Sequence, residues 1–160
     1  MNKNRRMLIA SLLYMGSGLP AIAGQMVYSP GEMLRKLAGE RDRFALLYFV
    51  QQGCQYCAKE NPILAQFQKH TGWYIKQIDI HQEPEVNTKF NISNTPTIIL
   101  IAEGMDSRSW QPVSYGFSEA DMLLKSIYGI TRVLRGESSP QLLDSFLIHG
   151  QSTSFAGAQQ

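Results

Sequence analysis

The sequence predicts an α/β fold in which helices flank a mixed central sheet. Two runs of apolar, β-branched and aromatic residues, FALLYFV at 44–50 and TIILIA at 97–102, are typical of strands that helices cover on both faces. Helical patterns separate the first strands, whereas two strands follow one another near the end, so the sheet combines crossovers with a hairpin. A length of 160 residues, with 44% apolar and 18% charged side chains, fits a single globular domain.

Each element follows from local signals. Ser29, Pro30 and Glu32 form a capping box with proline at the first helical position, and Gly39 ends that helix. Apolar and polar residues alternate well enough in the segment WYIKQIDI to predict a strand. In chain order we predict helix 29–39, strand 44–50, helix 54–70, strand 73–80, short helix 86–90, strand 97–102, edge strand 113–116 and a helix from 118.

A further short helix is predicted after Gly136, where Ser139 and Pro140 can cap it. Its apolar side chains are Leu142, Leu143, Phe146 and Leu147. That apolar face either covers the core of the domain or docks a partner. The last ten residues are small and polar, which predicts a disordered tail.

The first 23 residues have the anatomy of a secretory signal peptide. Lys3, Arg5 and Arg6 form a basic segment, and a mostly apolar run follows at 7–19. Ala21-Ile22-Ala23 then supplies a cleavage site. A membrane anchor is the alternative, but the run is short for a bilayer and is interrupted by glycines. We therefore expect a cleaved signal and a periplasmic protein.

Cleavage would remove three cations and no anion. The 15 basic side chains then fall to 12 against 13 acidic ones, and the net charge changes from +2 to −1. The basic character of the chain belongs to the export signal. We predict no nucleic-acid partner, because no run of cations remains.

The chain contains two cysteines, Cys54 and Cys57, with Gln55 and Tyr56 between them. A bond between residues so close in sequence constrains almost no loop, so the pair indicates chemistry rather than stabilisation. Cys54 lies where the buried strand ends and a helix begins, and the free N–H groups and dipole of a helix start favour its thiolate. We expect Cys54 to be exposed and to attack a disulfide. Cys57, one turn later and facing inward, would resolve the mixed disulfide.

Half of a zinc site is the alternative for two cysteines at this spacing. A structural zinc site commonly uses four protein ligands, often in two such pairs. His70, His81 and His149 are scattered along the chain without ligand spacing, so we predict surface histidines and no metal. Thiol–disulfide exchange also needs no bound cofactor, because the cysteine pair carries the electrons.

A second feature is Thr95-Pro96-Thr97 at the entrance to strand 97–102. Proline is tolerated at the first residue of a strand, and X–Pro bonds are the usual place for a cis peptide. An ordinary loop proline is the alternative reading of this motif alone.

Taken together, these motifs resemble the thioredoxin superfamily over about residues 44–130. The matching pieces are the strand FALLYFV, CQYC, Pro62, the segment QIDIHQEP, the segment NISNTPTIIL and Gly116. The resemblance implies the thioredoxin fold, with Cys54 as nucleophile and Cys57 as resolving thiol. It implies a cis-proline at Pro96 packed against the pair and a backbone at Thr95 that pairs with the substrate chain. Gln55 and Tyr56 join Thr95 and Pro96 as candidate substrate-binding residues.

Within the superfamily, Tyr56 and Thr95 resemble periplasmic disulfide isomerases of the DsbC type. The export signal, single small domain and C-terminal extension resemble the TrbB/TraF group of F-type conjugative transfer and its type IV secretion apparatus. Two features depart from these patterns. Tyr48 occupies the position where thioredoxins place a buried acid, which leaves open how Cys57 loses its proton. Residues 24–43 are also too few for the separate dimerisation domain of DsbC.

The sequence thus predicts a periplasmic disulfide isomerase or reductase acting on exported or pilus-assembly proteins. An isomerase must be kept reduced, which implies a membrane electron donor of the DsbD kind. A net oxidase remains open within the same chemistry, and a non-catalytic thioredoxin-fold assembly factor is the alternative from another class. The predicted organisation is a signal peptide at 1–23, an N-terminal helical segment at 24–43, a thioredoxin-like domain at 44–135, and a short helix with a flexible tail at 136–160.

Overall fold

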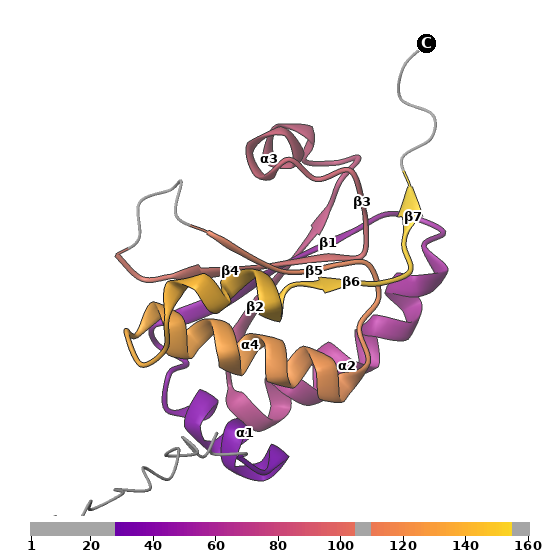
Figure 1. The fold of residues 1–160 in the computed structure, drawn as a ribbon. Helices are drawn as coiled ribbons and strands as arrows, with labels where there is room; N and C mark the ends of the chain where they lie inside the picture. Colours follow the sequence, from indigo (N-terminus) through magenta and orange to yellow (C-terminus); the bar gives the residue numbers. More distant parts are fainter. Residues whose placement is uncertain (1–27, 105–109, 155–160) are drawn as a thin grey trace, which may run out of the picture.

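A five-stranded mixed sheet forms the centre of the computed structural model, which describes residues 28–104 and 110–154 (Figure 1). The strand order is β2-β1-β4-β5-β6, and a separate two-stranded sheet pairs β3 with β7. The strands are β1 (Phe44–Val50), β2 (Tyr74–Asp79), β3 (Asn94–Thr95), β4 (Thr97–Ala102), β5 (Gln111–Tyr115), β6 (Ile148–His149) and β7 (Thr153–Ser154). The helices are α1 (Pro30–Ala38), α2 (Gln55–Thr71), α3 (Pro84–Phe90), α4 (Ala120–Leu134), the 3₁₀ turn η1 (Pro140–Leu142) and α5 (Leu143–Phe146).

The sheet has both parallel and antiparallel pairs, as the sequence predicts. Strand β1 runs parallel to β2 and antiparallel to β4, and β4 runs antiparallel to β5. Helices α1, α2 and α4 lie on one side of the sheet and α3 lies on the other (Figure 1). These relationships confirm the α/β, thioredoxin-like fold.

The two faces of β1 explain its continuous apolar sequence. Leu46 and Tyr48 point into the larger core with α1, α2 and α4, whereas Leu47 and Phe49 point into a smaller core with α3. Successive side chains of a strand alternate between its faces, so a strand covered on both sides must be apolar throughout.

Helix α1 is held by both its start and its packing. Ser29 and Glu32 form the predicted capping box. At the other end, the indole Nε1 of the fully buried Trp73 donates a 2.7 Å hydrogen bond to the carbonyl oxygen of Leu37. The chain before strand β2 is thereby fixed to the end of α1.

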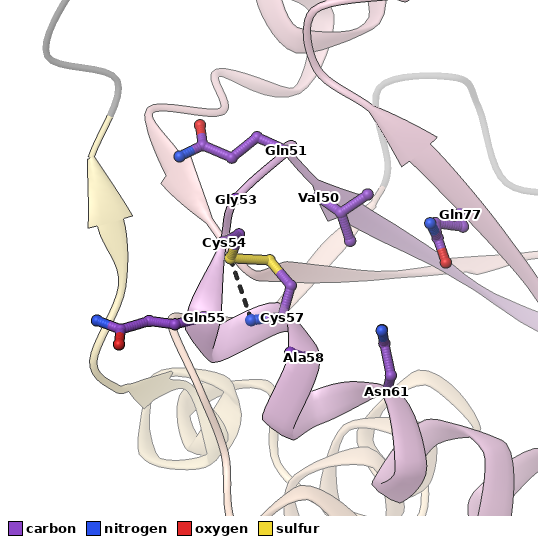
Figure 2. Close-up of a pocket in the computed structure, with 9 residues that line it drawn as sticks. All are labelled: Val50, Gln51, Gly53, Cys54, Gln55, Cys57, Ala58, Asn61 and Gln77. Carbon is purple, nitrogen blue, oxygen red and sulfur yellow. Dashed lines mark hydrogen bonds between the residues drawn. A yellow bond between two sulfur atoms is a disulfide. The ribbon is translucent and has the colours of Figure 1, made fainter.

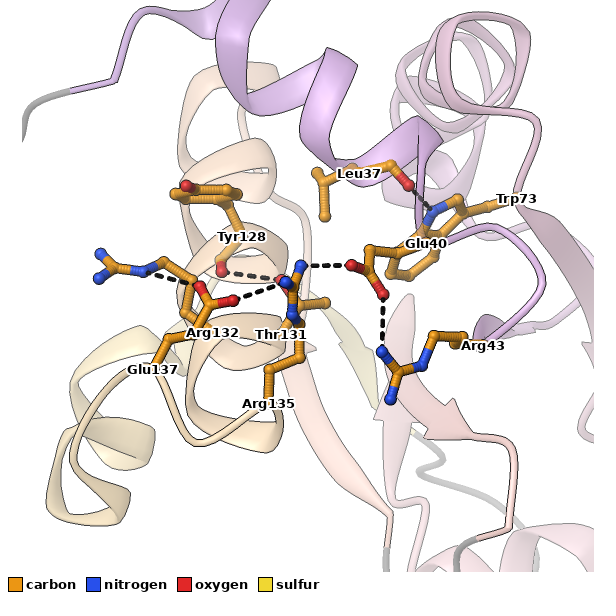
Figure 3. A network of polar contacts seen from close by, with 9 residues as sticks. All are labelled: Leu37, Glu40, Arg43, Trp73, Tyr128, Thr131, Arg132, Arg135 and Glu137. Atoms are coloured by element: carbon orange, nitrogen blue, oxygen red, sulfur yellow. Dashed lines mark hydrogen bonds and ion pairs between the residues drawn. The ribbon is translucent and has the colours of Figure 1, made fainter.

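A network of charged side chains joins the segment after α1 to the end of α4 (Figure 3). Glu40, whose side chain is 11% exposed, pairs with Arg135 and with Arg43. Arg135 also contacts Glu137 at 2.6 Å, and Glu137 contacts Arg132 at 3.7 Å. The network connects two helices on the same face of the sheet.

Two sequence predictions for the C-terminal region are wrong. The strand predicted at 113–116 is β5, and it is not an edge, because β6 pairs with it in parallel. Of the tail predicted to be disordered, residues 153–154 instead form β7, which pairs with β3, and residues 155–160 lie outside the described residues. Both corrections arise from backbone hydrogen bonds in strands of two residues, which leave no hydrophobic pattern.

The short helix after Gly136 forms as predicted, as η1 and α5. Leu143 and Phe146 pack against the larger core, so this face covers the domain. The hydroxyl of Ser126 fixes it by donating a 2.5 Å hydrogen bond to the carbonyl oxygen of Phe146.

The predicted signal peptide at 1–23 lies outside the described residues. Within the described ranges, no helix combines the length and the apolar character needed to cross a bilayer.

Candidate functional site

The site is built where strand β1 passes into helix α2. After Val50 the chain turns through residues 51–53, with Gly53 at a φ of +75°, a conformation that favours glycine. Cys54 is the N-cap of α2 in an extended conformation. The strand therefore places Cys54 at the positive end of a 17-residue helix, as predicted.

The two cysteines form a disulfide with an S–S distance of 2.04 Å. The backbone N–H of Cys57 donates to Sγ of Cys54 at 3.1 Å (Figure 2). The sulfur takes the place of the oxygen that usually caps a helix. A donor already aimed at this sulfur favours the thiolate when the disulfide is reduced.

Exposure of the pair differs from the prediction. Cys54 was expected to be exposed, but it is 6% exposed, close to the 5% of Cys57. Access is through an open hollow of about 410 Å³ that both cysteines line. The hollow offers a reacting sulfur a route to the pair.

Every side chain that lines the hollow is uncharged, and four are amides (Figure 2). The lining residues are Val50, Gln51, Gly53, Cys54, Gln55, Cys57, Ala58, Asn61 and Gln77. Amides both donate and accept hydrogen bonds, so the wall suits the polar groups of a peptide backbone.

Tyr48 anchors the helix turn that carries Cys57. Its hydroxyl lies 3.1 Å from the carbonyl oxygen of Cys57 and 3.0 Å from Oδ1 of Asn61, and it can donate its proton to one of them at a time. Burial, with a smaller contribution from the Glu60 carboxylate, raises the pKa of Tyr48 far above its usual value. The hydroxyl is therefore a neutral donor and does not replace the buried acid of thioredoxins.

A buried carboxyl is nevertheless present, on α2 rather than on β1. Glu60 is 0% exposed and lies three residues after Cys57. Its Oε2 accepts a 2.8 Å hydrogen bond from the backbone N–H of Ser118, whereas Oε1 has no hydrogen-bond partner among the described residues. Burial raises the pKa of Glu60 to about 7, opposed by the Ser118 hydrogen bond and assisted by the charge of Glu119.

The cis-proline loop lies at the same end of the sheet as the cysteine pair. The Thr95–Pro96 bond is cis, as predicted. Thr97, the next residue, pairs with Phe49 near the end of β1, and the carbonyl oxygen of Pro96 accepts a 2.8 Å hydrogen bond from Gly116. Strand register thus brings Pro96 to the strand end from which Cys54 extends.

The structure places the remaining predicted residues around this point. Gln55 is exposed and lines the hollow, and Tyr56 is half-buried, with the Lys59 ammonium 5.4 Å from its ring centre. Thr95 is fully buried, and its backbone pairs with Thr153 of β7. The edge expected to receive a substrate is therefore occupied by the chain itself.

Sequence reasoning missed three features of the site: the amide wall, Glu60 and β7. Glu60 has a detectable signal, because its spacing from Cys57 and Leu64 places it on the inward face of the helix. Gln77, on β2, joins the lining of the hollow only through the parallel pairing of β1 and β2.

The three histidines are exposed, as predicted. Across residues 28–104 and 110–154, no three side chains of His, Cys, Asp or Glu gather as a metal site would require.

The fold and the site define a class of protein: a thioredoxin-like chain whose closed cysteine pair, at a helix start and at the same end of the sheet as a cis-proline, supports a role of the thiol–disulfide oxidoreductase type. The chain belongs to the family described as TraF, F plasmid transfer operon protein, whose model matches residues 28–128. No curated protein shows significant similarity to this chain.

Several solved structures are similar to this chain. Chloroplastic thioredoxin z is 23% identical with a TM-score of 0.47, covering 64% of this chain and 90% of its own. Thioredoxin-2 of the malaria parasite is 24% identical with a TM-score of 0.46, covering 54% of this chain and 82% of its own. Human ERp44 is 14% identical with a TM-score of 0.42, and the match covers 72% of this chain but 41% of ERp44.

Proposed function

We propose that this protein is a periplasmic disulfide isomerase or reductase that acts on exported proteins, including components of a conjugative pilus or type IV secretion apparatus. Cys54 is the nucleophile and Cys57 the resolving thiol. Thr95, Pro96, Gln55 and Tyr56 form the surrounding substrate-binding surface.

The observation that carries this proposal is the hydrogen bond from the Cys57 N–H to Sγ of Cys54 within a disulfide that opens onto a hollow. A purely structural disulfide would need neither an activating donor nor access. In the reduced protein, the Cys54 thiolate bonds to one sulfur of a client disulfide, and the other client sulfur leaves as a thiolate. Cys57 then bonds to Cys54, the mixed disulfide breaks, and the client is released reduced or returns to another pairing.

The cellular setting rests on the family description and on the predicted export signal. The clients would be exported proteins that assemble into the conjugation apparatus. Because each net reduction leaves Cys54 and Cys57 oxidised, the cycle needs a reductant, for which a membrane donor of the DsbD kind is the expected partner. No cofactor and no nucleic acid take part.

Reactivation of a scrambled multi-disulfide protein by the mature, reduced chain tests the proposal. We expect faster recovery than with buffer alone, and we expect the acceleration to vanish in Cys54→Ser. Equal recovery with the wild-type chain and with Cys54→Ser would show that the protein is not an isomerase of this substrate. A second measurement uses the same substrate with its native disulfides formed. A reductase reduces these disulfides, whereas an isomerase leaves them in place.

Trapping tests the two cysteine roles separately. Cys57→Ser should accumulate mixed disulfides with periplasmic proteins, because the resolving thiol is missing, whereas Cys54→Ser should accumulate none. If a chain lacking both cysteines still supports conjugative transfer at the wild-type frequency, the alternative of a non-catalytic assembly factor replaces this one.

A further inference from the structure

The C-terminal strap, residues 148–154, runs along the sheet and ends on the cis-proline loop. Its first part is β6, which pairs in parallel with β5, and the N–H of Gly150 continues the contact by donating to the carbonyl oxygen of Tyr115 at 2.8 Å. The carbonyl oxygen of Gln151 then accepts a 2.7 Å hydrogen bond from the N–H of Phe117. The strap is thus fixed to the chain on both sides of Gly116.

The end of the strap covers the edge of β3. Thr153 pairs with Thr95 and Ser154 with Asn94 in an antiparallel arrangement. The side-chain amide of Asn94 also donates a 2.9 Å hydrogen bond to the hydroxyl of Ser152. Figures 1 and 2 show β7 on the side of the molecule where α2 begins, with the Gln55 side chain directed toward it.

The passage between these contacts is tight. A Cβ atom at Gly150 would overlap the carbonyl oxygen of Phe117, and a Cβ atom at Gly116 would overlap the backbone of Gly150. Gly116 also has a φ of +101°. The two glycines allow the backbones to approach each other, so the route of the strap depends on these residue types.

The β7 pairing itself is short and weak. It involves two residues on each strand, and in water such a pair is marginal without further packing. Gln151 is exposed, and Ser152 and Thr153 are half-buried, small and uncharged. A competing strand can therefore displace β7 at modest free-energy cost.

We propose that β7 occupies the substrate-binding edge of β3 in the resting protein. An extended, uncharged segment of a disulfide-bearing client displaces β7 from this edge before exchange at Cys54. This inference rests on the proposed function. An exposed strand edge pairs with an extended peptide through backbone hydrogen bonds, and β7 shows that this edge accepts such a strand. Pairing at Thr95 places the client beside the hollow, whose uncharged amide wall suits the same kind of segment.

Two substitutions in the full-length mature chain test the strap by different means. Gly150→Ala forces the strap away from Phe117, and Thr153→Pro disrupts the β7 pairing directly. Gly31→Ala is the matched control, because a Cβ atom at this exposed position on α1 meets nothing within 4 Å. Thermal unfolding identifies any variant that has lost its fold.

The readout compares two disulfides that react with Cys54 of the reduced protein: an extended, uncharged peptide carrying an aromatic mixed disulfide, and the small aromatic disulfide reagent alone. Both release the same coloured thiolate. We expect the strap variants to react roughly threefold to tenfold faster with the peptide. In these variants the β3 edge is already open, whereas in wild type β7 must leave it before the peptide can pair. The rate with the small reagent should be unchanged.

The outcomes separate this proposal from the proposed function. If wild type and Cys54→Ser behave alike with both disulfides, the proposed function fails. If the reaction depends on Cys54 but the strap variants leave the peptide rate unchanged, or raise both rates equally, competition for the β3 edge is refuted.

Hydrogen exchange gives a test that needs no strap variant. In Cys57→Ser joined to the peptide through Cys54, we expect the amides of residues 151–154 to exchange faster than in Cys57→Ser alone, since the peptide replaces β7. Unchanged protection of these amides in the mixed disulfide would overturn the proposal.

Discussion

The backbone N–H of Ser118 donates a 2.8 Å hydrogen bond to Oε2 of Glu60, a carboxyl group that is fully buried one helical turn beyond Cys57. The bond joins the start of α4 to the redox helix α2. It satisfies one oxygen of Glu60, and burial still raises the pKa of the group to about 7.

This pKa makes stability depend on pH. The folded protein holds the Glu60 proton more tightly than the unfolded chain, whose carboxyl has an ordinary pKa near 4.5. The contribution to stability is therefore fully present below pH 4.5 and is lost as the pH rises to about 7. At about 1.4 kcal/mol per pKa unit, the loss is on the order of 3 to 4 kcal/mol.

We expect Glu60→Gln to flatten the pH dependence of the unfolding free energy across this range, as measured by urea denaturation. Glu85→Gln, at an exposed position on α3, is the control and should leave the slope as in wild type. An unaltered slope in Glu60→Gln would mean that the carboxyl is already ionised at low pH in the folded protein.

Tyr48→Phe tests whether the Tyr48 hydroxyl only holds the helix turn of Cys57 in place or also affects the ionisation of the cysteine thiols. Loss of the hydroxyl removes the donor near the Cys57 carbonyl oxygen, so we expect a loss of about 1–2 kcal/mol in the unfolding free energy. Because the pKa of Tyr48 is raised by burial, the hydroxyl stays protonated near neutral pH. The pH profile of alkylation of the reduced cysteines should therefore be unchanged.

Tyr74→Phe is the control for this prediction, because Tyr74 is 63% exposed. It should change neither stability nor alkylation. A shifted alkylation profile in Tyr48→Phe, with Tyr74→Phe as wild type, would place the Tyr48 hydroxyl in the ionisation of the thiols.

The sequence predicts the main elements well because they are long and strongly patterned. The run FALLYFV is apolar on both faces of β1, and Ser29 and Glu32 make the capping box that the spacing indicates. The cysteine pair and Pro96 are found in the same way, since residue type and spacing carry their chemistry.

The features that the sequence does not predict depend on long-range contacts. Strands β6 and β7 have two residues each and form through backbone hydrogen bonds, which every residue type except proline can donate. Cys54 is 6% exposed as a member of the larger core, which gathers residues from distant parts of the chain. The spacing of Glu60 from Cys57 and Leu64 indicates the inward face of α2, but a glutamate ordinarily faces solvent, so its residue type argues against the burial that the fold shows.

Arg135→Ala tests the charged network at the end of α4. Glu40 would lose a guanidinium partner while remaining largely buried, so we expect a loss of about 1–3 kcal/mol in the unfolding free energy. Lys125→Ala removes an exposed pair with Asp121, with side chains 61% and 59% exposed, and should cost less than about 1 kcal/mol. Equal effects of the two substitutions in urea denaturation would show that the network adds no more than a surface pair.

Gly129→Ala tests how α5 covers the core. Alanine favours a helix over glycine by about 1 kcal/mol, which alone would stabilise α4. A Cβ atom at position 129 would, however, overlap the ring of Phe146, which packs directly on this buried glycine. We expect a net loss of stability, because Phe146 must move and the segment that it anchors must move with it.

Gly31→Ala supplies the matched comparison in α1, where the new methyl group meets nothing within 4 Å. It should be neutral or stabilising by up to about 1 kcal/mol, so the two substitutions are expected to have opposite signs in thermal unfolding. If Gly129→Ala is also stabilising, Phe146 does not pack on Gly129 in solution. The apolar face of α5 would then be free for a partner, which is the alternative that the sequence left open.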